Sequence, residues 1–383
     1  MSDAPPKIVI ACDKFKGSLS ATDVAEVIEK AVCSFNADMV VSSFVIADGG
    51  DGTLDALEKS GMSSYPITVS GPTGGEHESS YLFDGSTAVV ELADTCGIVH
   101  LPEGKLQPLK SSTYGLGQAI RAALSCCPRQ LIIGVGGSAS SDGGMGMLQA
   151  LGARFFNAEG FPLPPEGASL SQIACIDLSQ LDPQIKKTKI ILASDVDNEL
   201  LGPNGAVAVY GPQKGAVGAI AEELEHGLEV WSRFIEEIFG AGYASREGAG
   251  AAGGVGFAAM AVLGASMRPG IELVLELSGI EKELKDASLV ITGEGKLDAQ
   301  TLMGKAVAGV TKAAAAHNVD VVAVCGHSEL SPHEVSELGL KDVYAITDIE
   351  PDTDIAMKDA AKLLKMLCKN KLKKYVEAAC QSQ

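Results

Sequence analysis

The sequence predicts an α/β protein in which a parallel sheet is built from both ends of the chain. A second, mixed α/β part that contains antiparallel strands is inserted between those ends. At both ends, short apolar runs typical of buried strands alternate with helical patterns, and glycine-rich corners follow the strands. Between residues 65 and 92, short strand patterns follow one another closely, which is typical of antiparallel pairing.

The N-terminal part begins with strand, helix, strand and helix patterns. Ser20 followed by Asp23 resembles a capping box, and apolar residues then recur at helical spacing. The second strand ends in a glycine-rich turn at residues 48–53. The predicted ranges are strands over Lys7–Ala11 and Val40–Ile46, and helices after Ser20 and over Thr53–Lys59.

The inserted part, which we expect over residues 66–286, combines both kinds of strand pairing. The turn Asp84-Gly85-Ser86 joins two of its strands as a hairpin. The predicted strands are Tyr65–Ser70, Ser79–Phe83, Thr87–Leu92, an apolar run at residues 131–135, and Lys189–Ala193. The predicted helices include Ser111–Ser125 and Val217–Phe239.

The alternation of strands and helices returns near residue 287, so we expect residues 1–65 and 287–383 to form one discontinuous domain. Ligand sites of such wound parallel sheets lie at the carboxyl ends of the strands. Because loops of both domains carry candidate residues, we expect the active site in the cleft between them. The C-terminal ranges are strands Ser288–Ile291, Asp320–Cys325 and Val343–Ile346, the loop Gly293–Gly295, the helix Thr301–His317 and a final helix from Asp354.

The chain is organised around the glycine-rich loop at residues 136–144. The loop follows a predicted strand, and helical spacing resumes through Met147, Leu148 and Leu151. Such a loop presents backbone N–H groups without Cβ obstruction and precedes a helix N-terminus, so it suits a phosphate or a carboxylate. A tight strand-to-helix turn without a ligand is the alternative.

Composition excludes several classes of protein. The net charge of −19, from 30 Lys and Arg against 49 Asp and Glu, argues against nucleic-acid binding. Nine cysteines without a C-x-x-C pair argue for a reducing compartment, and the N-terminus lacks a signal-peptide pattern, so we expect the cytoplasm. The charge-free stretch Gly248–Met267 is interpreted as a buried helix rather than a membrane span.

Two other function classes stay open at this point. Gly134, Gly136 and Ala139, with Glu159 further on, give a relaxed match to the dinucleotide-binding pattern, which would make the protein an NAD-dependent oxidoreductase. A ligand-binding protein without turnover is the second alternative. The sequence contains no G-x-x-x-x-G-K-[ST] pattern, which excludes a P-loop nucleotide site.

Acidic and basic residues gather on the glycine-rich loops. Phosphoryl transfer needs carboxylates for Mg²⁺, cations and N–H groups for the triphosphate, and a base for the attacking hydroxyl. Each residue alone is often only turn chemistry or a solvated charge, but repeated placement at predicted strand ends favours function. The set comprises Asp13, Lys14, Lys16, Asp48, Asp51, Asp142, Asp195, Asp197, Lys214, Glu294, Asp298 and Lys305.

Recognisable motifs are spread along the whole chain. They are Phe15-Lys16-Gly17-Ser18-Leu19-Ser20, Ala47-Asp48-Gly49-Gly50-Asp51-Gly52-Thr53, Gly134 to Asp142, Asp195-Val196-Asp197-Asn198, Tyr210-Gly211-Pro212-Gln213-Lys214-Gly215, Pro269-Gly270-Ile271-Glu272, and Thr292-Gly293-Glu294-Gly295 with Asp298 and Lys305. In this order, the series resembles that of the bacterial-type glycerate kinases, in particular the glycerate 2-kinases. Cys12, Lys14, Ser194 and Glu199 depart from the expected pattern.

The resemblance implies a two-domain α/β fold with one Rossmann-like domain, here built from both chain ends. It also implies a kinase that uses ATP and Mg²⁺ to phosphorylate D-glycerate to 2-phosphoglycerate. A 3-phosphoglycerate product or a related small sugar acid as acceptor is the alternative. The expected partners are ATP and D-glycerate, without nucleic acid or membrane, and a homodimer is one expected assembly.

The chemistry of the residues, rather than the resemblance, suggests their roles. We expect Asp195, which ends a buried strand, to be the base, with Lys214 and Lys16 as catalytic cations. Lys214 is expected at the surface, where it meets a phosphate or a carboxylate. Substrate or anion binding is assigned to Gly137, Ser138, Ala139, Ser140, Ser141, Asp197, Asn198 and Arg268, nucleotide binding to Lys14, Ser18, Gly49, Gly50, Gly293, Glu294, Asp298 and Lys305, and Mg²⁺ binding to Asp48 and Asp51.

Overall fold

The structure is a computed structural model that describes residues 6–36, 38–102, 105–303 and 306–381. The chain falls into two compact units. Unit 1 contains Met1–Asp48, Asp55–Gly61 and Ile271–Gln383, and unit 2 contains Gly49–Leu54 and Met62–Gly270. The sequence analysis placed residues 271–286 in the inserted part, but they belong to unit 1, because the apolar side chains of this stretch pack in that unit's core.

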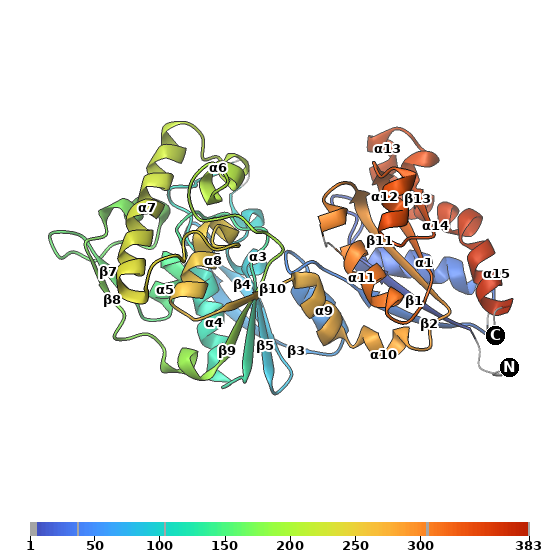
Figure 1. Cartoon of the computed structure of the whole chain (residues 1–383), viewed down its shortest axis with the longest axis horizontal. Helices are drawn as coiled ribbons and strands as arrows, with labels where there is room; N and C mark the ends of the chain where they lie inside the picture. Colours follow the sequence, from blue (N-terminus) through green and yellow to red (C-terminus); the bar gives the residue numbers. More distant parts are fainter. Residues whose placement is uncertain (1–5, 37, 103–104, 304–305, 382–383) are drawn as a thin grey trace. The chain divides into compact units, whose positions relative to one another are not determined.

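Unit 1 contains a five-stranded sheet in which all neighbouring strands are parallel, in the order β13-β12-β11-β1-β2 (Figure 1). Its strands are β1 (Lys7–Cys12), β2 (Val40–Val45), β11 (Leu289–Leu297), β12 (Val321–Ser328) and β13 (Asp342–Ala345). Its helices are α1 (Ala21–Cys33), α10 (Ile280–Leu284), α11 (Ala306–Ala315), α12 (Pro332–Glu337), α13 (Thr353–Lys358), α14 (Ala360–Lys371) and α15 (Lys373–Gln381). Two more helices, α2 (Thr53–Lys59) and α9 (Gly270–Ser278), start in unit 2 and continue in unit 1. The predicted parallel sheet from both chain ends is confirmed.

Strand β1 is buried on both faces, as a central parallel strand requires. Its side chains alternate, so that Ile8 and Ile10 enter a core with α1 and α14 while Val9 and Ala11 enter a second core with α9 and α11. Helix α1 begins where the sequence predicts, since the Ser20 hydroxyl accepts a hydrogen bond from the Asp23 N–H at 3.1 Å. Polar side chains therefore find no place along β1 except at its ends.

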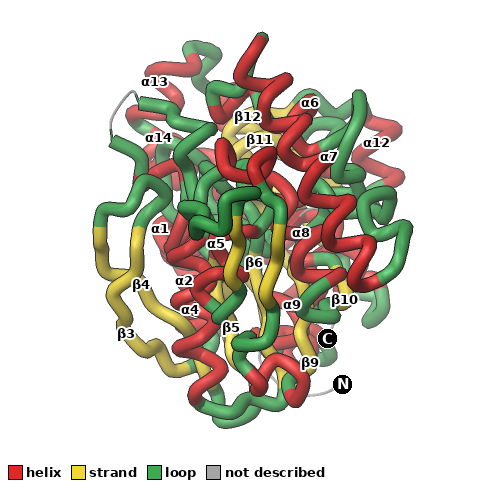
Figure 2. Tube along the Cα trace, turned by 90° about the vertical axis from the view of Figure 1, so that its left-hand side faces the viewer, coloured by secondary structure: helices red, strands yellow, loops and turns green. Residues whose placement is uncertain are grey.

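Unit 2 contains a six-stranded mixed sheet in the order β10-β9-β6-β5-β4-β3 (Figure 2). β10, β9, β6 and β5 are parallel, and β4 and β3 run antiparallel at one edge, as the hairpin pattern predicts. The strands are β3 (Ser63–Ser70), β4 (Glu76–Phe83), β5 (Thr87–Glu91), β6 (Gln130–Gly134), β9 (Lys189–Ala193) and β10 (Ser266–Arg268), with a separate pair β7 (Arg154–Phe156) and β8 (Cys175–Asp177). The helices are α3 (Leu92–Cys96), α4 (Tyr114–Ser125), α5 (Met145–Ala150), α6 (Ala206–Tyr210), α7 (Ala219–Phe239) and α8 (Ala251–Ala261).

Two predicted segments differ from the structure in the kind of element that they form. Residues 293–295, predicted as a loop, lie inside β11, because β11 continues its parallel pairing with β12 as far as Leu297. The charge-free stretch Gly248–Met267 forms only the short helix α8, which is interrupted by positive φ angles at residues 252–254, and then enters β10. No helix within the described part of the chain is long and apolar enough to span a membrane.

The only tryptophan of the chain, Trp231, connects the core of unit 2 to the glycine-rich loop. Its side chain is fully buried and makes edge contacts with Phe155 and Phe257, at centroid distances of 5.5 and 6.2 Å. Its Nε1–H donates to the carbonyl of Gly143 at 3.0 Å. The helix α7 that carries Trp231 therefore holds this loop through a polar bond inside an apolar core.

Trp231→Phe should lower the free energy of unfolding by about 1–3 kcal/mol, because it leaves the buried carbonyl of Gly143 without its donor. Urea unfolding followed by circular dichroism measures the change. Phe239→Leu, at the more exposed end of the same helix, is the control and should stay within about 0.5 kcal/mol of the parent protein. Equal stabilities of the Trp231 variant and the parent would contradict this account of the loop.

Candidate functional site

In unit 1, three carboxylates lie near one another where the parallel strands β1 and β2 have their carboxyl ends. Asp13 directly follows β1, Asp48 lies just after β2, and Glu294 lies in β11, the strand beside β1. The N–H of Asp13 donates to the carbonyl of Gly293 at 2.8 Å, which ties the two strands together here. Burial, together with the charges of Asp48 and Glu294, raises the pKa of Asp13 to about 7. This edge would therefore favour a bound cation.

The loop after β1 brings two predicted cations to the same edge of the sheet. The N–H of Lys14 donates to the Asp13 carboxylate at 2.6 Å, and the Lys14 charge lowers the pKa of Asp13. Lys16 is exposed. The hydroxyl of Ser18 donates to the carbonyl of Phe15 at 3.1 Å and so closes the turn between them. Lys14 and Lys16 thus lie where a nucleotide phosphate could meet them.

The predicted nucleotide-binding residues of β11 are held by local contacts. A Cβ on Gly293 would lie 2.1 Å from the carbonyl oxygen of Val324, so only glycine fits there. The buried Glu294 carboxylate accepts from the Thr301 hydroxyl at 2.7 Å. Asp298 accepts from the N–H of Gln300 at 2.9 Å. Lys305, the remaining member of this set, lies outside the described residues.

In unit 2, the loop Gly49–Leu54 packs across the ends of parallel strands. A Cβ on Gly49 would lie 2.8 Å from the Cα of Gly270, and a Cβ on Gly134 would lie 2.7 Å from the carbonyl oxygen of Gly49. A Cβ on Gly136 would lie 2.5 Å from the Cα of Gly50. The glycines of these motifs are therefore needed because backbone lies directly against backbone. Asp51, a predicted Mg²⁺ ligand, is exposed on this loop.

The glycine-rich loop differs in part from the predicted anion cradle. Ser138, Ala139, Ser140 and Ser141 are all buried, and Gly137 has the positive φ of 72° that glycine readily adopts. The N–H of Ala139 donates to the carbonyl of Cys96 at 3.2 Å, and the N–H of Ser140 donates to the hydroxyl of Ser138 at 3.1 Å. These two N–H groups are therefore occupied inside the protein.

Asp142 is the central residue of this loop. Its buried carboxylate accepts from the N–H and the hydroxyl of Thr113, both at 2.8 Å, and from the N–H groups of Gly144 and Gly146 at 3.2 and 3.1 Å. Burial raises the pKa of Asp142, and these four donors oppose that rise. The sequence analysis noted Asp142 as a candidate without a role, and the structure assigns it the task of holding the loop.

Lys214 corrects the sequence analysis, which expected an exposed side chain. The side chain is only 3% exposed, and its ammonium donates to the carbonyl of Ser140 at 2.6 Å. Burial lowers the pKa of Lys214 to about 8, against the opposing charge of Asp142. Beside it, the buried hydroxyl of Ser141 has no hydrogen-bond partner among the described residues. Lys214 therefore contacts the predicted anion-binding loop itself.

The predicted base, Asp195, lies just after β9, at the carboxyl ends of the parallel strands of unit 2. Asp195 is exposed, and its carboxylate accepts from the N–H of Gly270 at 3.0 Å, which fixes its direction. Asn198 accepts from the Tyr210 hydroxyl at 2.6 Å. Arg268, at the end of β10, is half-buried, and its carbonyl accepts from the Ser194 N–H at 3.1 Å. Asp197 is exposed beside this group, and burial together with its charge raises the pKa of Tyr210.

The sequence analysis assigned no role to Glu91, the last residue of β5. This carboxylate is 3% exposed and accepts from two backbone N–H groups of the loop Gly49–Leu54. The available signal was an acidic residue directly after the apolar run AVV, at the end of the strand TAVVE. Burying such a side chain is costly unless hydrogen bonds compensate, so a carboxylate in this position indicates a specific partner.

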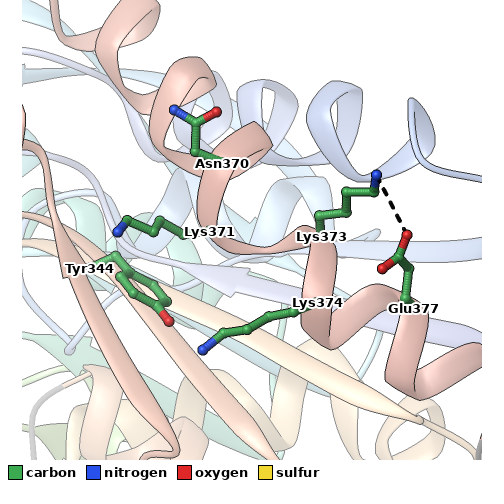
Figure 3. A pocket seen from close by; sticks show the side chains of 6 residues that line it. All are labelled: Tyr344, Asn370, Lys371, Lys373, Lys374 and Glu377. Carbon is green, nitrogen blue, oxygen red and sulfur yellow. Dashed lines mark ion pairs between the residues drawn. The ribbon is translucent and has the colours of Figure 1, made fainter.

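A separate hollow of about 450 Å³ lies in unit 1 and contains none of the predicted site residues (Figure 3). Its lysines have local partners, since Lys373 pairs with Glu377 at 3.7 Å and Lys374 pairs with Asp342 at 3.4 Å. Among the residues that the structure describes, no three or more His, Cys, Asp and Glu side chains are arranged to hold a metal ion. The lining residues are Tyr344, Asn370, Lys371, Lys373, Lys374 and Glu377.

Comparison with known proteins identifies the family of this chain. The model of the glycerate kinase family matches residues 8–375. A glycerate kinase of Bacillus subtilis (strain 168) is 40% identical over 94% of both chains, and a glycerate 2-kinase of Escherichia coli (strain K12) is 39% identical over 89% of this chain and 90% of its own. A crystal structure from Salmonella typhimurium LT2, described as a glycerate kinase 2, is 38% identical and superposes with a TM-score of 0.84, covering 98% of this chain and 100% of that chain.

The chain therefore belongs to the glycerate kinase family, an enzyme family of the kinase class. The resemblance drawn from its motifs is confirmed over nearly the whole length of the chain. The roles of the site residues remain predictions. Each of the described site residues lies either in unit 1 or in unit 2.

The buried ammonium of Lys214 predicts a pH-dependent difference in stability. Between about pH 8 and the usual lysine value of 10.5, the unfolded chain binds a proton at this position that the folded protein has released. The free energy of unfolding therefore gains up to about 1.4 kcal/mol per pH unit in this interval from this residue. Lys214→Met lacks this gain, so the stability of the parent relative to the variant should rise as the pH rises.

Denaturant unfolding at several pH values between 7 and 10.5 measures this difference. Lys187→Met, at an exposed lysine of the same unit, is the matched control and should give a difference that does not change with pH. A constant difference for Lys214→Met would show that its ammonium is not buried in solution.

Proposed function

We propose that this protein transfers the γ-phosphoryl group of ATP to D-glycerate, with Mg²⁺ as cofactor, and that the product is 2-phosphoglycerate. The relatives named as glycerate kinases support the acceptor, and the relative named as a glycerate 2-kinase supports the position. Phosphorylation at the 3-hydroxyl, or of a related small sugar acid, is the alternative that product analysis distinguishes. Location in the cytoplasm and assembly as a homodimer stay predictions.

The observation that carries the proposal is the set of carboxylates and lysines at the sheet edge of unit 1. Asp13, Asp48 and Glu294 interact electrostatically there, and Lys14 lies beside them. Phosphoryl transfer depends mainly on positioning and on charge stabilisation of the phosphates, which needs both kinds of group. Hydride transfer to NAD does not require such a cluster of carboxylates, so the arrangement favours the kinase.

Asp48 and Asp51 are the proposed ligands of Mg²⁺, with Asp13 and Glu294 near the first of them. Only three peptide units separate Asp48 from Asp51, so their Cα atoms lie within about 11 Å in any conformation of the chain. The donor set fits Mg²⁺, which in nucleotide sites takes one or two carboxylates and receives its other ligands from phosphates and water. When bound, the ion would offset the negative charge of the phosphates.

Asp195 is the proposed base for the acceptor hydroxyl. Its carboxylate is exposed, and the Gly270 N–H donates to one of its oxygens, which fixes the direction of the group. Asp197, Asn198 and Arg268 at the same strand ends are proposed to bind the glycerate hydroxyls and carboxylate. This division assigns the acceptor chemistry to the strand ends of unit 2.

The cations have different proposed tasks. Lys16 and Lys14, on the loop after β1, are proposed to contact the phosphates together with Ser18, Gly293 and Asp298. Lys214 is proposed to act through the carbonyl of Ser140, to which it donates. The anion-binding role then falls to the other groups of the glycine-rich loop. Gly49 and Gly50 are proposed to let the backbone approach the nucleotide.

The purified protein with MgATP should release ADP only when D-glycerate is present, and EDTA should abolish the release because the phosphates then lack their metal ion. A coupled ADP assay measures the rate, and phosphorus NMR of the product distinguishes 2-phosphoglycerate from 3-phosphoglycerate. Turnover that persists in EDTA would contradict the role of Mg²⁺. Absence of turnover with every three- or four-carbon hydroxy acid would contradict the proposed activity.

Asp195→Asn keeps the size of the side chain and a hydrogen-bond acceptor but removes the proton acceptor. The kcat for D-glycerate should fall by about 10²–10⁴-fold, the usual contribution of general-base catalysis. Asp197→Asn, two residues along the same exposed loop, is the matched comparison: as a proposed glycerate-binding residue it should raise the KM for D-glycerate and keep most of the kcat. If the Asp195 variant stays within about threefold of the parent and the Asp197 variant does not, the base is Asp197.

A further inference from the structure

Glu91 binds the backbone of the loop Gly49–Leu54 with both of its carboxylate oxygens. One oxygen accepts from the N–H of Gly52 at 3.0 Å and the other from the N–H of Leu54 at 2.9 Å. The two N–H groups belong to the residues on either side of Thr53, where helix α2 begins. The first N–H groups of a helix have no partner within the helix, and an N-cap side chain usually accepts a hydrogen bond from them. At this helix start, the carboxylate of Glu91 on β5 is the acceptor.

The rest of the loop is closed around this anchor. The hydroxyl of Thr53 donates to the carbonyl of Gly50 at 2.7 Å, which completes a tight turn around Asp51. The backbone of Gly49 and Gly50 lies against Gly134, Gly136 and Gly270, with no space for a Cβ at the contacts. Asp51 is thus the accessible side chain of a loop whose backbone is fixed on both sides of it.

Among the residues that the structure describes, Glu91 forms no ion pair. The negative charges of Asp51 and Asp94 oppose ionisation of Glu91 and raise its pKa. Burial raises the pKa of Glu91 to about 7, and the N–H groups of Leu54 and Gly52 act in the other direction. A buried carboxylate placed among other acids is an expensive way to stabilise a fold, which favours a task in holding this particular loop.

We infer that Glu91 is a positioning residue for phosphoryl transfer, which fixes the loop Gly49–Leu54 through two backbone N–H groups and thereby sets the place of the Asp51 carboxylate. This inference rests on the proposed function, because Asp51 acts there as a ligand of Mg²⁺. Glu91 itself is buried and need not touch the substrates. Its replacement should therefore affect catalysis only through the loop.

The first test is hydrogen exchange of the parent protein and of Glu91→Gln, both without nucleotide or metal. A glutamine oxygen can accept from only one of the two N–H groups, and its own NH₂ group opposes the other. At least one of the amides of Gly52 and Leu54 should exchange about ten times faster or more in the variant, because hydrogen bonds to charged groups are among the stronger ones. Glu91→Asp, which keeps the charge but is shorter, should show the same direction of change.

Two control variants separate this effect from general destabilisation. Glu76→Gln neutralises an exposed glutamate on the neighbouring strand β4 and should leave exchange in the loop unchanged. Val90→Ala, next to Glu91 on β5, opens a cavity in the core of unit 2 and lowers stability without touching the loop. In Val90→Ala, the exchange rates of the Gly52 and Leu54 amides should therefore stay unchanged relative to those of the other amides of unit 2.

The second test is a double-mutant cycle with Asp51 under conditions where all variants are folded. Glu91→Gln should lower kcat by about tenfold or more and raise the Mg²⁺ concentration needed for half-maximal rate, as Asp51→Asn should. If Glu91 acts through Asp51, the double variant should be little worse than Asp51→Asn alone. Val90→Ala should keep both kinetic values of the parent.

Each outcome decides one point. Faster exchange with non-additive kinetics supports the inference, whereas unchanged exchange at Gly52 and Leu54 overturns it. Faster exchange with independent, additive losses, or with unchanged kinetics, overturns the link to Asp51. A parent protein without glycerate-dependent ADP release overturns the proposed function itself, and the inference falls with it for that separate reason.

Discussion

Strands that are buried on both faces admit polar side chains only at their ends, and the placement of the candidate residues depends on this constraint. In β1 the alternate side chains enter two different apolar cores, so the first charged residue after Lys7 is Asp13, just beyond the strand. β6 and β9 are likewise apolar until they reach the glycine-rich loop and Asp195. Parallel strands place these ends at one edge, so burial alone gathers the acids and lysines of each unit.

Close backbone contact is the second constraint, and it acts in unit 2. Gly49, Gly134 and Gly136 leave no space for a Cβ where the loop Gly49–Leu54 crosses the strand ends. The sequence analysis attributed these glycines to ligand approach, whereas the structure gives them a packing role as well. The same argument holds at Gly253, where a Cβ would lie 2.2 Å from the carbonyl oxygen of Ser140. These glycines are thus required where backbone segments that are distant in the sequence contact each other.

The sequence predicted what depends on local pattern. The two sheets, the Ser20 cap and the strand over residues 189–193 follow from apolar runs and capping chemistry, and the structure has them. It did not predict individual side-chain hydrogen bonds between distant segments, because no local pattern encodes them. Lys214 bonds a carbonyl 74 residues away, and Glu91 bonds an N–H 37 residues away. Burial at both positions follows from the tertiary fold, so their roles became visible only in three dimensions.

Two buried carboxylates share the work of fixing the loops in unit 2. Asp142 accepts four hydrogen bonds within and around the glycine-rich loop, and Glu91 accepts two from the loop Gly49–Leu54. Neither forms an ion pair with a described residue, so each depends on N–H and O–H donors whose directions are set by the backbone. Such donors hold a carboxylate only in one geometry, and the loops are therefore ordered before any ligand arrives. Ordering in advance lowers the cost of aligning the reacting groups, which is how a buried acid that need not touch the substrates contributes to catalysis.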